Sequence, residues 1–214
     1  MMISEAAQES VYFFTGADFL LVNALLWRND ANVGRGIEAV YRNNTGIIQE
    51  AMEMTPAVRW GVSKEEGQKR LEAYQRRTPD EINEAAKAEM IETAINDIHN
   101  ICNAMQPADT EMLLYRNVVE DFAIQSPTIG EEVDLIGITS TSTTGQQIDY
   151  GKNDFKITFY QYEIRVAAGM PVLVLENDYR QENEVILPPM RYRITGVRDK
   201  IIALEAIKPL DVGL

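Results

Sequence analysis

Apolar residues in the first half of the chain recur at the spacing of an α-helix. The clearest stripe is formed by five residues separated by three or four positions, Ile91, Ile95, Ile98, Cys102 and Met105. Thr78 is expected to cap the start of this helix, because Pro79 suits the first helical position and Glu81 completes a capping box with Thr78. The pattern therefore predicts a long helix that begins at Pro79.

Three further helices are expected in this half. Ala17–Arg28 and Gly36–Met54 carry helical apolar patterns, and Ser63–Glu66 repeats the capping box ahead of a shorter helix. The first half is therefore predicted to be a layer of helices.

After Ala108 the pattern changes to short runs of β-branched and aromatic residues. Eight strands are predicted, over Met112–Tyr115, Val133–Thr141, Ile157–Tyr162, Ile164–Ala167, Pro171–Leu175, Val185–Leu187, Tyr192–Val197 and Ile201–Ala206. Helices followed by strands favour an α+β fold, in which an amino-terminal helical layer packs on a mixed or antiparallel β-sandwich. No Pro-, Gly- or Ser-rich linker interrupts the chain, so we expect residues 1–214 to form a single domain, helical over about 12–107 and strand-rich over about 110–208.

The charge of the chain restricts its partners. Its 214 residues include 20 Lys and Arg against 33 Asp and Glu, a formal net charge of −13, and both halves are acidic. Because nucleic acids and anionic membranes are bound by clustered Lys and Arg, we expect neither as a partner. The first ten residues lack the basic and apolar regions of a secretion signal, which leaves the route of delivery open.

The composition also argues against several kinds of site. Cys102 and His99 are the only cysteine and histidine, so an internal disulfide is excluded, and a structural zinc site or a Ser-His-Asp triad is not expected. No glycine-rich phosphate loop is present. We therefore expect no metal, and any nucleotide must be bound in another way.

Three short motifs carry candidate chemistry. The first is Arg116, at the end of an apolar run, where its planar fork could hold a phosphate or a carboxylate. The second is the hydroxyl-rich segment 139–143, which follows an apolar strand. In the third, Glu182 and Glu184 precede the strand Val185–Leu187, and at strand period they point to the same side. Two like charges at that spacing repel each other unless a ligand or a cation lies between them, so this motif is the strongest sign of a functional site.

The order and spacing of these motifs resemble the R-S-E class of mono-ADP-ribosyltransferases, the family that includes arginine-specific enzymes. Arg116, Ser140 within the S-T-S of residues 140–142, and the E-x-E of Glu182 and Glu184 match its three motifs. Upstream, Phe14 and Asn23 are similar to the family's helical segment that closes over the dinucleotide. The resemblance covers about residues 12–207 and implies the α+β fold of that family, with NAD as co-substrate.

The resemblance also implies roles for residues of the first two motifs. Arg116 would clamp the phosphates of NAD and brace the site, and the backbone of Asn117 would lie near the nicotinamide amide. Ser140 would orient Glu184, and Thr141 and Ser142 would shape the same strand.

The remaining roles concern the reaction itself. Glu184 would bind the 2′-hydroxyl of the nicotinamide ribose and stabilise the positive charge that develops as the glycosidic bond breaks. Glu182 would hold and deprotonate the attacking group, and in this family a Glu there goes with arginine as acceptor. Tyr179 is similar to the aromatic residue that recognises the target protein.

The resulting hypothesis is an NAD-dependent protein-arginine mono-ADP-ribosyltransferase, an effector domain of a toxin, phage or interbacterial system. The expected partner is a target protein that presents an arginine, with an immunity or delivery partner besides. We expect a monomer that acts in the cytosol of a host or target cell. The alternatives are an NAD glycohydrolase or an RNA ADP-ribosyltransferase that uses the same site, and a catalytically silent interaction domain that keeps the fold.

Overall fold

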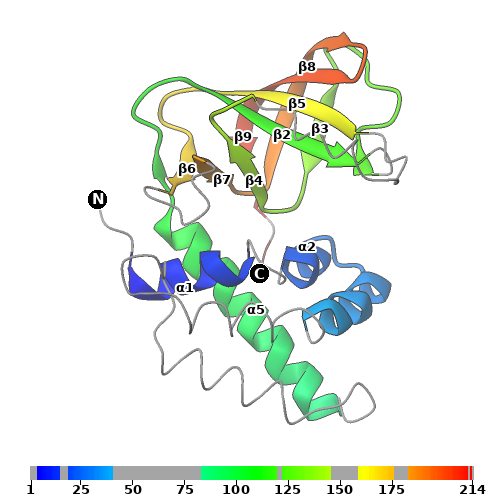
Figure 1. Ribbon diagram of the computed structural model, residues 1–214, viewed down its shortest axis with the longest axis vertical. Helices are drawn as coiled ribbons and strands as arrows, with labels where there is room; N and C mark the ends of the chain where they lie inside the picture. The colour runs from blue at the N-terminus through cyan, green and yellow to red at the C-terminus, as the bar shows by residue number, and fades with distance from the viewer. Residues whose placement is uncertain are drawn as a thin grey trace. The chain divides into compact units, whose positions relative to one another are not determined.

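The computed structural model describes residues 4–14, 19–40, 83–119, 122–145, 159–175, 183–211 and 213. The chain divides into two units, one comprising Met1–Met105 with Gly213–Leu214 and the other Gln106–Val212. The described part of the first unit is helical and that of the second is rich in strands (Figure 1). This arrangement confirms the α+β prediction.

Three of the four described helices of the first unit begin at a side-chain cap. The helices are α1 (Glu5–Phe13), α2 (Phe19–Leu26), a helix over residues 30–40, and α5 (Glu84–Ala104). Ser4 accepts from the Ala7 amide at 3.2 Å, and Asn83 accepts from the Ala86 amide at 3.0 Å. Asn29 accepts from the Asn32 amide at 3.2 Å at the start of helix 30–40. These bonds satisfy amides that have no partner within the helix.

The caps correct two predicted helix starts. Helix α5 begins at Glu84 because Asn83 caps it, and not at Pro79. Thr78, Pro79 and Glu81 lie outside the described residues, as does the segment Ser63–Glu66.

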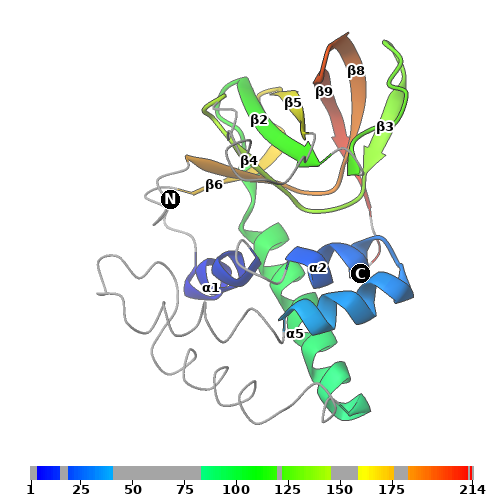
Figure 2. The same ribbon diagram turned by 45° about the vertical axis from the view of Figure 1, so that its right-hand side comes forward.

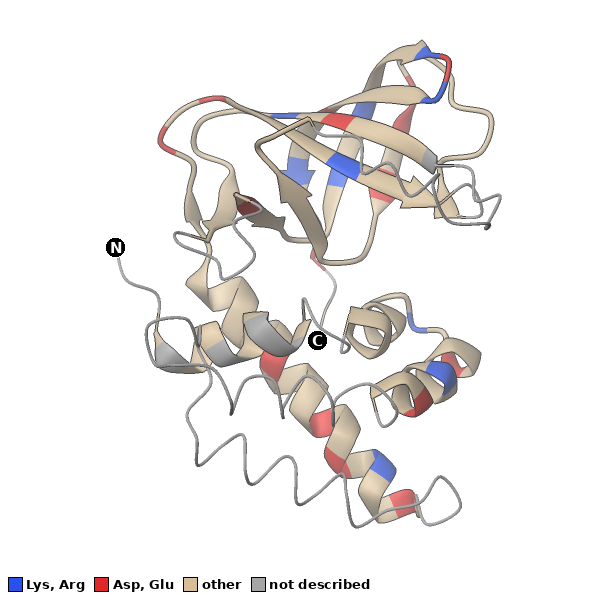
Figure 3. Cartoon of the chain, in the orientation of Figure 1, with Lys and Arg blue, Asp and Glu red and all other residues tan. Residues whose placement is uncertain are grey.

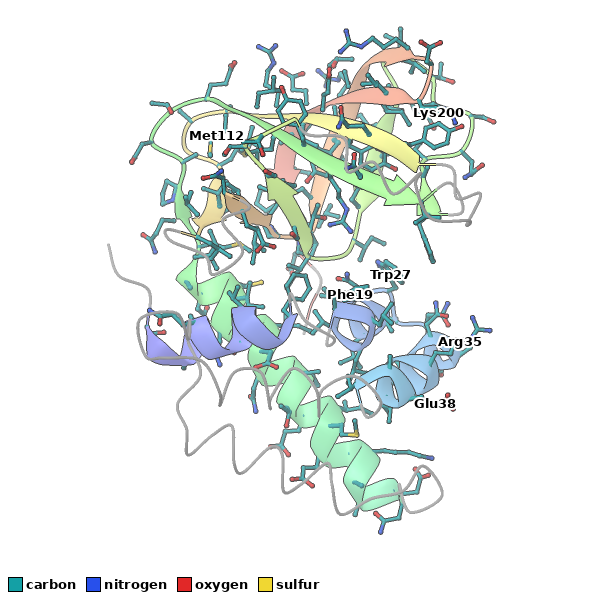
Figure 4. The ribbon with its side chains drawn as sticks, viewed as in Figure 1. Phe19, Trp27, Arg35, Glu38, Met112 and Lys200 are labelled. Carbon is teal, nitrogen blue, oxygen red and sulfur yellow. The ribbon has the colours of Figure 1, made fainter. Side chains whose placement is uncertain are left out.

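The other predicted start, at Gly36, lies in the middle of a helix. This helix is already under way at residue 30, and Arg35 and Glu38 are exposed along it (Figure 4). A Cβ on Gly36 would lie 2.7 Å from the Leu21 Cα, so this glycine allows the helix to approach α2 closely and does not interrupt it. Helix α1 was not predicted.

The buried face of α5 differs by a small rotation from the predicted stripe. Its buried residues are Ala86, Met90, Ala94, Asp97, Ile98 and Ile101. Of the predicted stripe only Ile98 is buried, and its other members are half-buried at the margin. The rotation is explained by α1, which packs against α5 and donates from the Ser10 hydroxyl to Asp97 Oδ1 at 2.7 Å. Hydrogen bonding allows a carboxylate to face the interior, which hydrophobic periodicity does not anticipate.

In the described part of the second unit, nine strands form one mixed sheet. Its strands are β1 (Gln106–Pro107), β2 (Met112–Val119), β3 (Glu132–Leu135), β4 (Thr139–Ser142), β5 (Phe159–Val166), β6 (Pro171–Val174), β7 (Glu184–Leu187), β8 (Met190–Arg198) and β9 (Ile201–Pro209). Their order across the sheet is β1-β6-β7-β4-β2-β5-β9-β8-β3. The pairing of β5 with β9 is parallel and all the other pairings are antiparallel.

Two parts of the sheet are divided into strands differently from the prediction. The single strand predicted over Val133–Thr141 is two strands, because the chain leaves β3 at one edge of the sheet and enters β4 between β7 and β2. The two strands predicted on either side of Glu163 are the single strand β5. Glu163 lies within β5 because it pairs with both neighbouring strands, β2 and β9, and its side chain is 2.6 Å from that of Arg198.

The sheet curves around its own core (Figures 1 and 2). One buried cluster draws side chains from strands at distant positions in the sheet, including Val185 of β7, Leu114 of β2 and Tyr192 of β8. A flat sheet could not bring these strands into one cluster, so the strands enclose the core as the two layers of a sandwich do. The turn between β8 and β9 is held beside β5, because the Gln161 amide donates to the carbonyl of Lys200 at 2.8 Å (Figure 4).

Charged residues of both signs are interspersed along the strand-rich unit (Figure 3). Pairs of opposite charge link neighbouring strands, for example Arg191 with Asp134 at 2.7 Å and Arg193 with Glu132 at 3.0 Å. Arg191 holds the pKa of Asp134 below its ordinary value. Among the described residues, no helix has the length and apolar character needed to cross a membrane.

Candidate catalytic site

The hydroxyl-rich segment forms strand β4, whose side chains alternate between two faces. Thr139 and Thr141 are buried, while Ser140 and Ser142 are half-buried. Across the pairing with β7, Ser142 lies opposite Glu184 and Ser140 lies opposite Ile186. Because paired residues share a face of a sheet, Ser140, Ser142 and Glu184 lie on the same face.

Ser140 and Glu184 are in direct contact. The Ser140 hydroxyl donates a hydrogen bond to Glu184 Oε1. Glu184 is 8% exposed, so its carboxylate is nearly enclosed by protein. A hydrogen bond from a hydroxyl to a carboxylate stabilises the ionised form and fixes its orientation. The predicted role of Ser140, to orient Glu184, requires a contact of this kind.

The threonines of β4 donate from their hydroxyls to backbone carbonyls. Thr141 Oγ1 donates to the Val185 carbonyl at 2.5 Å, and Thr139 Oγ1 donates to the Gly137 carbonyl at 3.3 Å. Thr141 therefore supports the pairing of β4 with β7, and its side chain lies on the face opposite Glu184. Ser142 lies on the face of Glu184, and its hydroxyl is 2.9 Å from that of Thr144.

Arg116 is connected to the same serine. It lies within β2, not at the end of a strand as predicted, and its Nη1 donates to the carbonyl oxygen of Ser140 at 2.9 Å. The structure thus brings Arg116, Ser140 and Glu184 together in one chain of contacts. Arg116 braces β4 at the residue that holds the glutamate.

The surroundings of Arg116 are unusual for a guanidinium. Burial lowers its pKa, and the electrostatic influence of Tyr192, Tyr162 and Glu184 offsets part of this effect. Arginine remains charged in proteins, so a positive charge is maintained beside the buried carboxylate of Glu184.

The two tyrosines beside Arg116 were not predicted from the sequence. Tyr162 lies directly opposite Arg116 across β2 and β5, and its hydroxyl accepts from the Ile124 amide at 2.8 Å. Tyr192 is fully buried, and its hydroxyl has no hydrogen-bond partner among the described residues. Alternation along β8 indicates that Tyr192 is buried, but only the curvature of the sheet brings it near Arg116.

Asn117 and its neighbours form a polar continuation of this site. Asn117 lies opposite Gln161, whose Nε2 donates to Asn117 Oδ1 at 3.3 Å. Gly145 lies against the ring of Tyr115, so closely that an added Cβ would be 3.1 Å from it. Tyr115 in turn lies opposite Ser142. Asn117 is two residues from Tyr115 in β2, so it lies in the same part of the sheet as the predicted catalytic residues.

The third motif departs from the sequence-based expectation. The prediction that Glu182 and Glu184 point to the same side requires an extended residue between them. Asn183 instead has a φ of 49°, in the left-handed region, and β7 begins only at Glu184. Strand alternation therefore does not apply across Asn183, and it no longer supports the prediction that the two glutamates share a side. Glu182 and Tyr179 lie outside the described residues.

Phe14 and Asn23 belong to the helical unit, which is described here by itself. Phe14 ends α1 and is 2% exposed, and Asn23 lies within α2 and is 8% exposed. The Oδ1 atom of Asn23 is buried, with no hydrogen-bond partner in the described part of the chain. The contacts that link Arg116, Ser140 and Glu184 lie within the strand-rich unit alone. Within the described ranges, no group of three or more His, Cys, Asp or Glu residues could hold a metal ion.

Comparison with known proteins identifies the fold. No protein-family model matches the chain, and no curated protein does. Among solved structures, the catalytic domain of VahC from Aeromonas hydrophila is similar over 97% of this chain and all of its own, with 15% identity and a TM-score of 0.50. The Vis toxin, an ADP-ribosyltransferase from Vibrio splendidus, covers 81% of this chain and 86% of its own, with 15% identity and a TM-score of 0.43. The C3 exoenzyme of Clostridium limosum is similar over 75% of this chain and 95% of its own, with 16% identity and a TM-score of 0.43. The chain has the ADP-ribosyltransferase fold.

Proposed function

We propose that this protein is an NAD-dependent mono-ADP-ribosyltransferase that modifies arginine side chains of a target protein. The observation that carries the proposal is the contact of Arg116 with Ser140 and of Ser140 with Glu184. These are the three positions at which the sequence resembles the R-S-E class, and they occur in a chain with the ADP-ribosyltransferase fold. Such a chain of contacts is not expected of three unrelated surface residues.

The geometry around Glu184 suits the cleavage of NAD. A carboxylate that is nearly buried, and held by one hydroxyl, can stabilise a positive charge on a neighbouring sugar with little reorganisation. In the proposed reaction the bond between the ribose C1′ and the nicotinamide nitrogen breaks. Its electron pair goes to the nitrogen, and neutral nicotinamide leaves. Glu184 stabilises the oxocarbenium-like ribose that remains.

Arg116 would act on the other part of the dinucleotide. Its Nη1 is bound to the Ser140 carbonyl, and a guanidinium offers five N–H donors in all. We assign it both the bracing of β4 and, through its positive charge, the binding of an NAD phosphate. In a chain with a net charge of −13, a cation in this position also offsets the repulsion that a dianionic substrate would meet.

The assignment of arginine as the acceptor rests on the glutamate at position 182. A guanidinium is cationic and a poor nucleophile, so a carboxylate beside it would both attract it and accept its proton as its nitrogen bonds to C1′. Tyr179 would contribute to the recognition of the target. We place the reaction in the cytosol of a target cell, as the work of an effector domain.

Incubation of the protein with labelled NAD and with bacterial and eukaryotic lysates tests the proposal, with modified residues mapped by mass spectrometry. We expect label on arginine residues of a target protein. Glu184→Gln keeps the size of the side chain but removes its charge, and it should abolish both labelling and NAD cleavage. Glu182→Ala should lose transfer and retain part of the NAD hydrolysis.

Each outcome of this experiment separates one alternative. Release of nicotinamide without protein label would indicate an NAD glycohydrolase, and label on RNA would indicate a different acceptor. If Glu184→Gln labels as well as the unmodified protein, the assignment of Glu184 is wrong. If neither protein cleaves NAD, the chain is a silent interaction domain.

A further inference from the structure

The backbone turns sharply at Asn183, the residue directly before Glu184. Its φ of 49° lies in the left-handed region, which asparagine tolerates better than most residues other than glycine. The Asn183 side chain is exposed, so packing in the core does not impose this conformation. The conformation therefore reflects the path that the backbone must follow at this point.

Two neighbouring segments hold Glu184 in place. Glu184 pairs with Ser142 of β4, and its carbonyl oxygen accepts from the Leu175 amide at 3.0 Å, just after β6. The Asn183 carbonyl accepts from the Thr143 amide at 3.2 Å, which extends the contact with the chain after β4 by one residue. Together with the bond from Ser140, these contacts fix both the backbone and the side chain of Glu184.

The left-handed residue separates Glu184 from the residues before it. In a continuous strand, fixing Glu184 would also fix the face on which the side chain two residues earlier lies. Strand alternation ends at Asn183, so the pairing of the sheet determines the position of Glu184 but not that of the residue two positions before it. The direction in which the chain approaches Glu184 depends on the conformation of residue 183.

We propose that Asn183 is a positioning residue that sets the balance between transfer to an acceptor and hydrolysis of NAD. This inference rests on the proposed function, which assigns NAD cleavage to Glu184 and the acceptor to Glu182. An extended residue at position 183 leaves Glu184 in the sheet but redirects the chain before it. NAD cleavage then continues, while transfer to arginine is impaired.

The test compares two substitutions at position 183. Glycine adopts the left-handed region readily, so Asn183→Gly should keep the ratio of transfer to hydrolysis. A β-branched residue is a genuine outlier there, so Asn183→Val should lower this ratio about tenfold, mainly by slowing transfer. The exchange rate of the Thr143 amide, measured by NMR, should rise in Asn183→Val and not in Asn183→Gly, because the bond to the residue 183 carbonyl is lost.

Asp199→Val provides the matched control. Asp199 has a φ of 50° in the turn between β8 and β9, away from Glu184 in the chain, so the same strain is introduced at another site. This variant should lose stability but keep the ratio of transfer to hydrolysis.

Three results would overturn the inference. They are an unchanged ratio in Asn183→Val, an equal loss of both activities in that variant, and a lowered ratio in Asn183→Gly, which would make the side chain and not the backbone responsible. If the unmodified protein itself does not cleave NAD, the proposed function fails and this inference fails with it. Cleavage by the unmodified protein with no effect of Asn183→Val defeats only the inference.

Discussion

At the scale of the residue, Arg116 shows how one side chain can join strand packing to chemistry. It lies in the middle of β2, where a charged group is costly, yet it is only half-buried and its hydrogen bond goes to a backbone carbonyl. Through its hydrogen bond to the Ser140 carbonyl, the Arg116 guanidinium helps to fix the position of β4. Replacement of Arg116 should therefore disturb the geometry of Glu184 as well as weaken the proposed binding of an NAD phosphate.

Substitution of Tyr192 tests the buried surroundings of Arg116. Its hydroxyl is enclosed and has no partner among the described residues, and such a group costs about 1–3 kcal/mol of stability. Tyr192→Phe should therefore raise the free energy of unfolding by about 1 kcal/mol near pH 8, as measured by urea denaturation. A less stable variant would mean that the hydroxyl has a partner, such as a buried water molecule.

The same variant should also change the dependence of stability on pH. Burial raises the pKa of Tyr192 and of Tyr162, so in alkaline solution these tyrosines release their protons from the unfolded chain before the folded one. The unfolded state then binds fewer protons, and the free energy of unfolding falls as the pH rises above about 10. Tyr192→Phe should show a smaller fall between pH 8 and pH 11, and an equal fall would argue against this origin.

At the scale of the element, the packing of α2 against helix 30–40 depends on a glycine. An added Cβ at Gly36 would lie 2.7 Å from the Cα and 2.9 Å from the amide nitrogen of Leu21, and backbone atoms cannot move aside easily. Gly36→Ala should therefore destabilise the protein by about 1–3 kcal/mol, despite the higher helix propensity of alanine. Thermal unfolding measures the change.

Gly34 in the same helix is the control, since a Cβ there meets nothing within 4 Å. Gly34→Ala should raise stability by up to about 1 kcal/mol. Similar effects of the two substitutions would show that helix propensity, and not contact with Leu21, decides the outcome.

Sequence analysis predicted the type of most elements but not their ends or their neighbours. Hydrophobic periodicity identified α2, α5 and most strands, because a buried stripe or alternating face is a local property. It joined β3 to β4, because nothing local in Val133–Thr141 reveals that the two halves belong to distant parts of the sheet. It also placed two strands on either side of Glu163, whereas pairing with β2 and β9 keeps this residue within β5.

The candidate site was predictable to a different extent. Arg116, Ser140 and Glu184 were identified from short motifs, and the structure brings them into contact. Tyr192 could not be linked to them, since its proximity to Arg116 depends on the curvature of the whole sheet. The left-handed turn at Asn183 could have been predicted, because asparagine is enriched at such positions. Strand periodicity was instead applied across this residue.

At the scale of the whole molecule, charge bears on the proposed encounter with a target protein. A net charge of −13 favours the approach of a basic surface that presents arginine, and this attraction is screened by salt. The kcat/KM for transfer to a basic protein acceptor should fall about tenfold as ionic strength rises from ~20 mM to ~300 mM. NAD hydrolysis without an acceptor protein is the control and should change less. An equal response of both reactions would show that the surface charge does not act on the encounter with the target.

The position of β9 has a consequence for the synthesis of the protein. This strand is the last of the described strands in the chain, yet it lies inside the sheet, between β5 and β8. On the ribosome, β5 and β8 must therefore wait for residues 201–209 before the ladder between them can be completed. The cluster around Arg116 includes Tyr162 of β5 and Tyr192 of β8, and it remains open until then. A growing chain thus assembles the surroundings of the candidate site late, when nearly all of the strand-rich unit has emerged from the ribosome.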